Sequence, residues 1–278
     1  MSSSTETIIR LGFFAGVLLA MTAWEFVAPR RRLIARKPLR WMSNLGLVAL
    51  NAILIRLVLP LTTLGTAALA HERGWGLLQQ VGLAEWLKFV IGVAALDFAI
   101  YVQHVVFHAV PLLWRLHMVH HADLDFDVTT GLRFHTLEIV LSALIKIGVV
   151  FALGPPVWAV LTFEVALNAT SMFSHGNVRL PARLDSLLRL VVVTPEMHRV
   201  HHSVERREAN TNFGFNLPWW DYLLGTYHAQ PAAGHEGMQI GVTHLREERT
   251  VERLPSMLLL PFVGGTGGYP SGEREDRG

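Results

Sequence analysis

The sequence predicts an all-α membrane protein in which several transmembrane helices carry a histidine-rich helical cap. Its 278 residues are 51% hydrophobic and only 17% charged, with a mean hydropathy of +0.35. A soluble domain would be less apolar and more charged. Several apolar runs are long enough to cross a bilayer as helices, and most of the fourteen histidines lie near the ends of these runs. We therefore expect a polytopic integral membrane protein whose cap lies on the cytoplasmic side.

The composition also excludes several kinds of site. The chain has no cysteine, which rules out disulfides, thiolate zinc sites, iron–sulfur clusters and thiolate-ligated haem. The net charge of +2 and the isoelectric point near 9.2 are compatible with an anionic partner. Because the basic residues cluster beside an apolar run, they favour lipid headgroups as that partner and argue against nucleic acid.

Residues 1–82 predict N-terminal transmembrane helices joined by a basic loop. The first apolar run covers residues 8–28, and Pro29 ends it. Six arginine and lysine side chains follow between residues 30 and 40. By the positive-inside rule this loop is cytoplasmic, which places the N-terminus outside.

Two further apolar runs lead to the first histidines. The second run covers residues 41–70 and contains Arg56, whose charge is costly in lipid and whose role the sequence leaves open. A short glycine-containing loop at 71–82 is expected on the outside. The third run begins near residue 83 and continues to His108, so it delivers its histidines to the cytoplasmic side.

The next two runs predict a helical hairpin within a catalytic domain that covers residues 83–228. Residues 136–153 are apolar, the sequence Gly-Pro-Pro at 154–156 breaks the run, and residues 157–173 are apolar again. A hairpin leaves and returns to the same side of the membrane. His175 is therefore expected on the face that carries the other histidines.

The remaining sequence predicts short helices and loops. Residues 184–193 read as an interfacial segment, and the sequence Thr-Pro-Glu beginning at Thr194 is typical of a helix start. Residues 217–227 mix tryptophan and tyrosine with aliphatic residues, as at a membrane interface. Residues 229–278 form a C-terminal tail, which we expect to be disordered from Gly264 onward because glycine, proline and charge dominate there.

The histidines recur at helical spacings. Residues three or four apart share one face of a helix. One HxxxH pair precedes the first of two HxxHH blocks, and a single histidine follows the hairpin. These nine residues are His104, His108, His117, His120, His121, His175, His198, His201 and His202.

Nine imidazoles on one membrane face predict two metal ions. Neutral imidazole is the commonest protein metal ligand, and one ion takes about four to six protein ligands. Imidazole suits iron, zinc, copper and nickel, so the ligand type alone leaves the metal open. Zinc can take the place of ferrous iron at such a site because its affinity is higher.

The order of these clusters resembles the fatty acid hydroxylase/sterol desaturase superfamily. The segments LWRLHMVHH, RFHTLE, HRVHH and WWDYLLGTY, all between Asp97 and Tyr227, are similar to that family's blocks. The resemblance implies that the nine histidines bind two iron ions. It also implies that O2 and two electrons are used to hydroxylate or desaturate a lipid.

The resemblance further implies a lipid substrate that enters from the bilayer. A separate electron-donor protein is implied because no segment resembles a flavin, NAD or haem domain. Sterol, fatty acyl, carotenoid and alkylglycerol lipids all remain open, as does the oligomeric state. Two other functions use similar residues: a di-zinc hydrolase and a membrane metal transporter. A transporter would place its ligands along mid-membrane spans, whereas most of these histidines lie between or after the spans.

Four further residues are candidates to orient or join the ligands. A metal-bound imidazole needs its second ring nitrogen held, usually by a carboxylate or a carbonyl. Asp97 shares one helical stripe with His104 and His108, and an ionisable residue inside a span suggests a role. His135 is either a ligand or a neighbour of the ligands. The four candidates are Asp97, Glu138, Asp221 and His135.

A second stripe of polar residues precedes the lone histidine. Its spacings of four, three and four place it on one helix face, where it is either the wall of a substrate tunnel or a set of helix–helix contacts. The stripe is Glu164, Asn168, Ser171 and His175. The histidines outside these patterns are expected to be ordinary surface or interfacial residues: His71, His228, His235 and His244.

Overall fold

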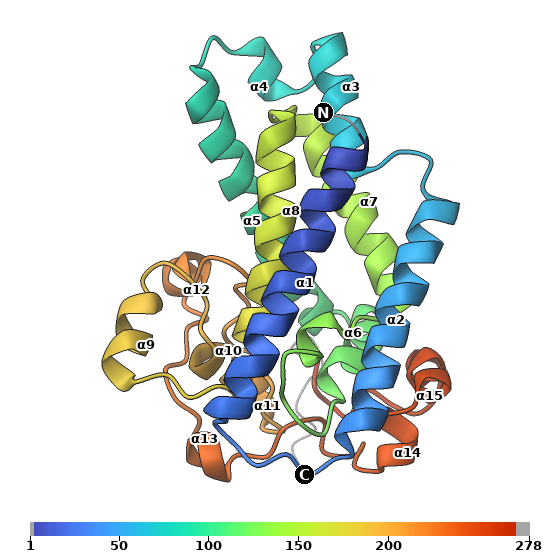
Figure 1. Cartoon of the computed structure of the whole chain (residues 1–278), viewed down its shortest axis with the longest axis vertical. Helices are drawn as coiled ribbons and strands as arrows, with labels where there is room; N and C mark the ends of the chain where they lie inside the picture. Colours follow the sequence, from blue (N-terminus) through green and yellow to red (C-terminus); the bar gives the residue numbers. More distant parts are fainter. Residues whose placement is uncertain (1–2, 271–278) are drawn as a thin grey trace.

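The computed structural model describes residues 3–270, which form helices and three isolated β-bridges. Five long helices build the bundle seen in Figure 1. They are α1 (Ser3–Val27), α2 (Lys37–Val58), α5 (Glu85–Ala109), α7 (Thr136–Leu153) and α8 (Val157–Ser174). The five segments that contain them are long and apolar enough to cross a membrane. The predicted all-α integral membrane architecture is therefore confirmed.

The second apolar run is not one helix, as the sequence analysis expected for residues 41–70. The α2 helix stops, and α3 (Thr63–Arg73) starts after a short break at Pro60. Proline has no N–H to donate and pushes the residue before it out of the helical region, and Leu59 is indeed extended. The Thr62 side chain then accepts a hydrogen bond from the first turn of α3 and so caps it.

The predicted hairpin is present as α7 and α8, and its turn lies at the end of the bundle away from the cap (Figure 1). A loop before α4 (Leu77–Gln80) packs against this turn. Gly76 has a φ of +93°, and a β-carbon there would overlap the backbone of Gly154. Because the turn is fixed at this end, the start of α7 and the end of α8 both face the histidine-bearing cap.

The short helices gather at the other end of the bundle and form the cap (Figure 1). Thr194 accepts a hydrogen bond from Met197 N, so the predicted helix start is confirmed. The cap helices are α6 (Pro111–His121), α9 (Ala182–Leu188), α10 (Pro195–His201), α11 (Arg206–Ala209), α12 (Trp219–Leu224), α13 (Gly234–Gly237), α14 (Glu248–Val251) and α15 (Leu254–Leu259), with 3-10 turns η1 (Thr130–Leu132) and η2 (Leu260–Phe262).

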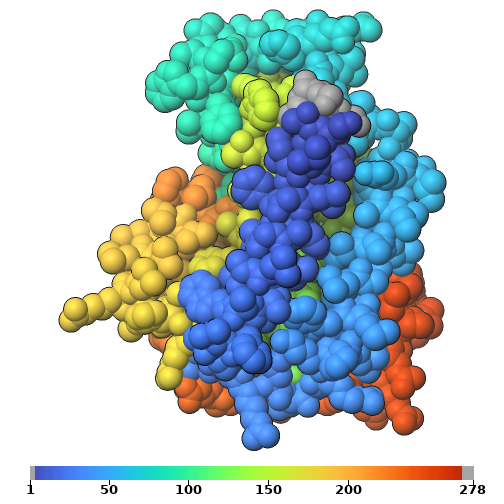
Figure 2. All heavy atoms as spheres, in the orientation of Figure 1, coloured from blue at the N-terminus to red at the C-terminus, as the bar shows by residue number. Residues whose placement is uncertain are grey.

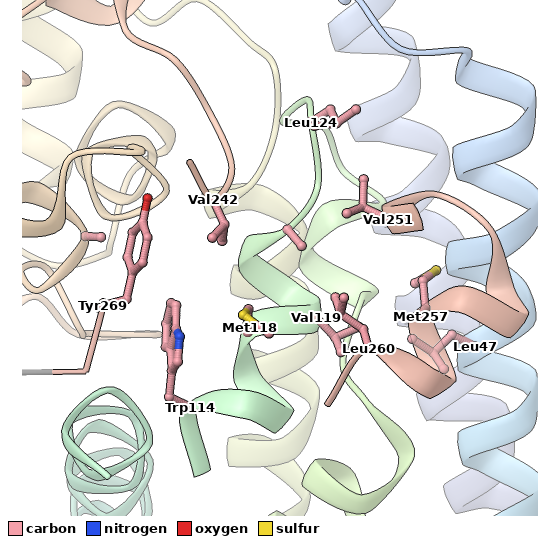
Figure 3. Close-up of a cluster of buried hydrophobic side chains, with 12 residues drawn as sticks. Leu47, Trp114, Met118, Val119, Leu124, Val242, Val251, Met257, Leu260 and Tyr269 are labelled. Carbon is pink, nitrogen blue, oxygen red and sulfur yellow. The ribbon is translucent and has the colours of Figure 1, made fainter. Parts of the chain in front are cut away.

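A buried apolar cluster joins the cap to the bundle (Figure 3). It brings Trp114 and Met118 of α6 together with Leu47 of α2 and with residues from the C-terminal segment. Tyr269 stacks on Trp114 with ring centroids 5.4 Å apart, and its hydroxyl donates to the carbonyl of Val204. The expectation of disorder from residue 264 is therefore wrong for residues 264–270, while 271–278 lie outside the described residues.

The basic loop after α1 attaches to the cap through ion pairs. Arg40 is fully buried and pairs with Asp123 at 2.7 Å and with Asp127 at 2.8 Å. Arg30 pairs with Glu196 at 2.8 Å. The sequence favoured lipid headgroups as the partner of this loop. The structure corrects that assignment for these two arginines, because long-range carboxylates from the cap neutralise them.

Candidate metal centre

Nine buried imidazoles converge in two groups at the junction of bundle and cap. The α5 helix supplies two of them, α6 three, the end of α8 one, and α10 with the residue that follows it three. Within each group the ligand atoms all lie within 4.8 Å of one another. The first group is His104, His108, His117, His121 and His201, and the second is His120, His175, His198 and His202.

Carbonyl groups set the tautomers of two rings in the four-histidine group. His175 Nδ1 lies 2.7 Å from the carbonyl oxygen of Ser171, and His120 Nδ1 lies 3.2 Å from that of Arg133. A carbonyl only accepts, so both Nδ1 atoms carry the proton and both Nε2 atoms present lone pairs. His175 Nε2 nevertheless lies 3.1 Å from the Nε2 atoms of His120, His198 and His202. The facing lone pairs of His175 and His120 repel each other unless they share a cation.

The five-histidine group shows the same arrangement. His104 Nδ1 donates to the carbonyl of Phe213 at 2.8 Å, and His201 Nδ1 donates to that of Thr211 at 2.7 Å. Their Nε2 atoms are buried and have no hydrogen-bond partner among the described residues. Buried polar atoms are rarely left unpaired. These nitrogens therefore fit a metal ion at the centre of the group.

The two groups are adjacent. The ring of His121 in the first group stacks on the ring of His202 in the second, with centroids 4.5 Å apart. Imidazole nitrogen is a ligand for iron, zinc, copper and nickel. The donor set therefore fits two neighbouring transition-metal ions, one in each group.

Burial keeps the cap histidines in the form that binds metal. It lowers the pKa of His117 to about 3 and that of His175 to about 4. An imidazole must be neutral to bind a metal ion. These two side chains are already neutral at pH 7, so a metal ion does not have to displace a proton from them.

Glu138 and Asp221 reach the ligands in different ways. Glu138 Oε1 lies 2.6 Å from His117 Nδ1, so the carboxylate accepts directly from a ligand ring. Asp221 accepts from the backbone N–H groups of Phe213 and Gly214 at 2.8 and 2.9 Å. Asp221 therefore fixes the loop that contains Phe213, and the carbonyl of Phe213 orients His104.

Asp97 has a different set of partners from the one that its helical stripe predicts. Its carboxylate accepts from Asn216 Nδ2, from the backbone N–H of Leu217 and from Trp220 Nε1, at 2.8, 3.3 and 2.8 Å. None of its hydrogen bonds among the described residues goes to an imidazole. The structure therefore places Asp97 away from direct contact with a ligand ring. Instead, it anchors the segment between the Phe213 loop and α12.

Two other histidines also differ from expectation. His135 precedes α7, where its Nδ1 accepts from Leu137 N and its Nε2 donates to the carbonyl of Leu258. Both ring nitrogens are engaged, and His135 belongs to neither histidine group. His235 is buried, with its Nε2 2.8 Å from the Glu196 carboxylate. It is not the surface residue that the sequence analysis expected.

A cavity of about 240 Å³ adjoins the five-histidine group inside the bundle. His104 and His117 form part of its wall at the metal end, and Lys146 and Asn168 lie further along it. Figure 2 shows α1 on the surface in front of α8, against which it packs, and Phe14 of α1 also lines this cavity.

The second polar stripe divides between two roles. Asn168 and Ser171 line the cavity, as the tunnel alternative requires. Glu164 is instead the centre of a helix–helix network, accepting from Arg10 at 2.5 Å and from Thr63 at 2.6 Å, with Lys146 at 3.4 Å. Part of the stripe therefore lines a cavity, and Glu164 joins helices.

The comparisons with known proteins agree with this geometry. The family described as fatty acid hydroxylase matches residues 89–226, about half of the chain, and this range contains all nine histidines. The chain belongs to the fatty acid hydroxylase family. No solved structure matches it.

Three relatives show how far the similarity to other hydroxylase-family proteins extends. Ornithine lipid hydroxylase OlsE from Rhizobium tropici is 32% identical over 156 residues, 56% of this chain and 46% of that protein. Alkylglycerol monooxygenase from Homo sapiens is 31% identical over 162 residues, 57% of this chain and 33% of that protein. Very-long-chain aldehyde decarbonylase GL1-1 from Oryza sativa subsp. indica is 28% identical over 186 residues, 63% of this chain and 29% of that protein. The chain thus spans less than half the length of these relatives.

Several residues of this hydroxylase-family centre could not be found by their spacing. Arg133 supplies the carbonyl that orients His120, and its guanidinium pairs with Glu252 at 2.5 Å. The sequence does contain a signal for a second supporting site. Three aspartates between residues 123 and 127 alternate with apolar residues next to an HxxHH block. This pattern indicates a buried acidic site that requires a cation, and Arg40 is that cation.

Proposed function

We propose that this protein is an O2-dependent lipid hydroxylase or desaturase that uses two iron ions held by the nine histidines. The observation that carries the proposal is the convergence of imidazole lone pairs in two adjacent groups. Membership of the fatty acid hydroxylase family supports the reaction class. Zinc would occupy the same ligands in a preparation that lacks iron.

The bound iron pair would supply the activation of O2 and the oxidation of a C–H bond, with two electrons from a separate donor protein. The chain's own residues would bind the metal ions and orient the ligand rings. The carbonyls of Ser171, Phe213 and Thr211 hold three ligand rings, and Glu138 holds His117. The cap cluster of Figure 3 packs over α6 and excludes water from that side.

The substrate is proposed to be a lipid because the cavity beside His104 and His117 lies among membrane-spanning helices. Two relatives carry lipid classes in their names, an ornithine lipid and an alkylglycerol. A metal transporter is disfavoured because the ligands gather at one end of the bundle and do not follow a path along it. No observation favours a hydrolase.

Lipid analysis tests the reaction. Membranes of a host that expresses the chain under 18O2 are compared with those of a host that expresses His120→Ala, and His244→Ala serves as the matched control because His244 is exposed. We expect lipids shifted by one labelled oxygen or by two hydrogens in the wild type and in His244→Ala, but not in His120→Ala. Identical lipid profiles in all three hosts would overturn the proposal.

The metal count is tested separately from the reaction. Purified wild-type protein should carry close to two metal equivalents, and a variant in one group, such as His201→Ala or His175→Ala, should carry close to one. Full activity with a single equivalent would refute the two-ion site.

The cytoplasmic location of the centre is also part of the proposal, and it rests on the basic residues after α1. Reporter fusions after Arg40, at Gly74 and after Val204 test it. The first and third should report the cytoplasm and the second the outside. An external signal from the fusion after Val204 would overturn this topology.

A further inference from the structure

The cavity beside the five-histidine group, the metal-side cavity, adjoins a second cavity on the lipid-facing side of the bundle. This outer cavity has a volume of about 230 Å³ and is lined from α1, α2 and α8. Two of its α1 residues, Leu11 and Phe13, are 61% and 56% exposed. Three residues line both cavities: Phe14 of α1, Val48 of α2 and Asn168 of α8. They therefore form the boundary between the metal-side cavity and the lipid-facing surface.

The surface is hollowed at this boundary. Figure 2 shows the hollow between the dark-blue α1 and the lighter-blue α2, with green atoms of deeper segments visible inside it. Phe14 and Val48 are only partly buried. Behind them, Ile139 and Ser142 of α7 line the far wall of the metal-side cavity. The hollow between α1 and α2 therefore leads towards that cavity.

Polar contacts hold α1 on both sides of the hollow. Near the start of the helix, Arg10 donates to Glu164 of α8 at 2.5 Å. Near its end, Glu25 accepts from the backbone N–H groups of Val128 and Asn177 at 2.7 and 2.9 Å. Between these points α1 and α2 share an apolar cluster, to which they contribute Phe14, Val17, Leu18, Trp41, Leu45 and Val48. The two helices are therefore fixed to the rest of the protein, and they meet at the hollow through apolar side chains.

An apolar contact between membrane helices is easily replaced by lipid. Lipid tails are as apolar as these side chains, so no hydrophobic force keeps the two helices together at this point. An alkyl chain that separates Phe14 from Val48 displaces dispersion contacts and brings dispersion contacts of its own. Its passage therefore requires side-chain rearrangement but does not require breaking the ion pair of Arg10 with Glu164.

A second opening of the metal-side cavity is less suited to an alkyl chain. A cavity of about 150 Å³ lies between α2 and α7, and it shares Ile139, Ser142 and Lys146 with the metal-side cavity. The Lys146 ammonium lies 3.4 Å from the Glu164 carboxylate at this boundary. An alkyl chain that entered here would surround charged groups with hydrocarbon, which is unfavourable. The boundary between α1 and α2 contains no ionisable side chain.

We propose that an alkyl chain of a bilayer lipid enters the metal-side cavity between α1 and α2, and that Phe14 and Val48 control its passage. This inference rests on the proposed function and adds the route by which its substrate arrives. A chain admitted at this point enters the same cavity whose wall includes His104 and His117. The width of the contact between Phe14 and Val48 then sets the rate of entry.

A cysteine inside the metal-side cavity can report the arrival of an alkyl chain without turnover, because the chain has no cysteine of its own. Leu167→Cys is suitable, since Leu167 lines this cavity and neither of its two neighbours. Zinc-loaded full-length protein in lipid nanodiscs is treated with hexadecyl methanethiosulfonate, which dissolves in the bilayer. The rate of modification is measured by intact mass. Methyl methanethiosulfonate, which has no long chain, measures the reactivity of the thiol itself.

Two variants in the Leu167→Cys background change the entrance in opposite directions. Val48→Trp overpacks the contact and should slow modification by the hexadecyl reagent about tenfold or more, relative to the methyl reagent. Phe14→Ala removes the ring that narrows the contact and should speed it about threefold or more. Ile147→Trp is the matched control, because Ile147 lines only the cavity between α2 and α7. It should leave the relative rate unchanged.

The zinc content of each variant shows whether the centre is intact. Slower modification in Ile147→Trp but not in Val48→Trp would place the entrance between α2 and α7 and overturn the inference. Equal relative rates in all variants would also overturn it. If Val48→Trp loses its zinc, Phe14→Ala decides alone: faster modification supports the entrance, and an unchanged rate refutes it.

The failure of this inference and that of the proposed function can be told apart. Oxidation of lipids by a protein whose modification rate ignores Phe14 and Val48 leaves the function standing and removes the inference. A modification rate that follows these two residues, in a protein that oxidises no lipid, leaves the entrance standing and removes the function.

Discussion

Glu138 illustrates what a single residue contributes to the centre. Its carboxylate accepts from His117 Nδ1 at 2.6 Å in a fully buried setting. Such a contact fixes the ring and raises the basicity of the nitrogen that faces the metal. The sequence favoured Asp97, which shares a helical stripe with His104 and His108, and offered Glu138 and Asp221 as further candidates. Only the folded structure shows that one of them contacts an imidazole.

Glu138→Gln should weaken metal retention by about 10–100-fold. The amide keeps the size of the side chain and one acceptor but loses the charge that polarises His117. Metal content after dialysis against a graded chelator measures the effect. Glu247→Gln, at an exposed position, is the control. Equal retention in the two variants would mean that the Glu138 charge is dispensable.

Asp97→Asn should affect the protein in a different way. Asp97 anchors Asn216, Leu217 and Trp220 and has no imidazole partner among the described residues. The asparagine side chain keeps one oxygen that accepts a hydrogen bond. Its NH2 group replaces the second carboxylate oxygen and cannot accept from the N–H groups that now donate to that oxygen. We expect a lower unfolding temperature with about two metal equivalents retained. Loss of metal at an unchanged unfolding temperature would restore the orienting role.

At the level of elements, the histidine positions were predictable and most of their supports were not. Helical spacing is local, so HxxxH and HxxHH place their side chains on one face wherever the helix lies. The carbonyls of Phe213 and Thr211, which orient His104 and His201, come from a loop distant in the chain. Spacing alone contains no information about such pairings.

Arg40 couples α2 to the loop that follows the first HxxHH block. Breaking a buried ion pair by removing one partner costs about 3–5 kcal/mol because a buried charge is left uncompensated. Arg40→Met should therefore lower the stability of the cap by about this amount, measured by thermal or denaturant unfolding. Arg36→Met is the control, since Arg36 pairs with Glu248 at an exposed position where such pairs contribute little. Equal effects would contradict the assignment.

At the level of the whole molecule, hydropathy predicted the five spans and the hairpin because lipid requires long apolar helices. The break at Pro60 and the ordered segment at 264–270 were missed for different reasons. The first was masked by a continuous apolar run. The second depends on Trp114, which is distant in the chain and stacks on Tyr269.

The many buried histidines predict a pH dependence for the whole cap. Burial lowers the pKa of His117 to about 3 and that of His175 to about 4, whereas an unfolded histidine titrates near about 6.5. Between these values the unfolded chain binds protons that the folded chain does not, so stability falls as the pH falls.

The unfolding temperature of the metal-free protein should therefore fall steadily as the pH is lowered from about 6.5 to about 4. Thermal unfolding of chelator-stripped protein in a series of buffers measures this. His228→Ala, at an exposed position, should follow the same curve. An unfolding temperature that stays constant or rises towards pH 4 would show that the histidines are not buried in the neutral form.

The stacking of Tyr269 on Trp114 has a consequence for the order of biosynthesis. The ring centroids of Trp114 and His108 are 4.8 Å apart, so the ring that covers His108 is itself covered only after residue 269 has been synthesised and has folded back. All five spans precede that residue in the chain and are available for membrane insertion before it. Membrane insertion of all five spans therefore does not depend on the segment that covers Trp114.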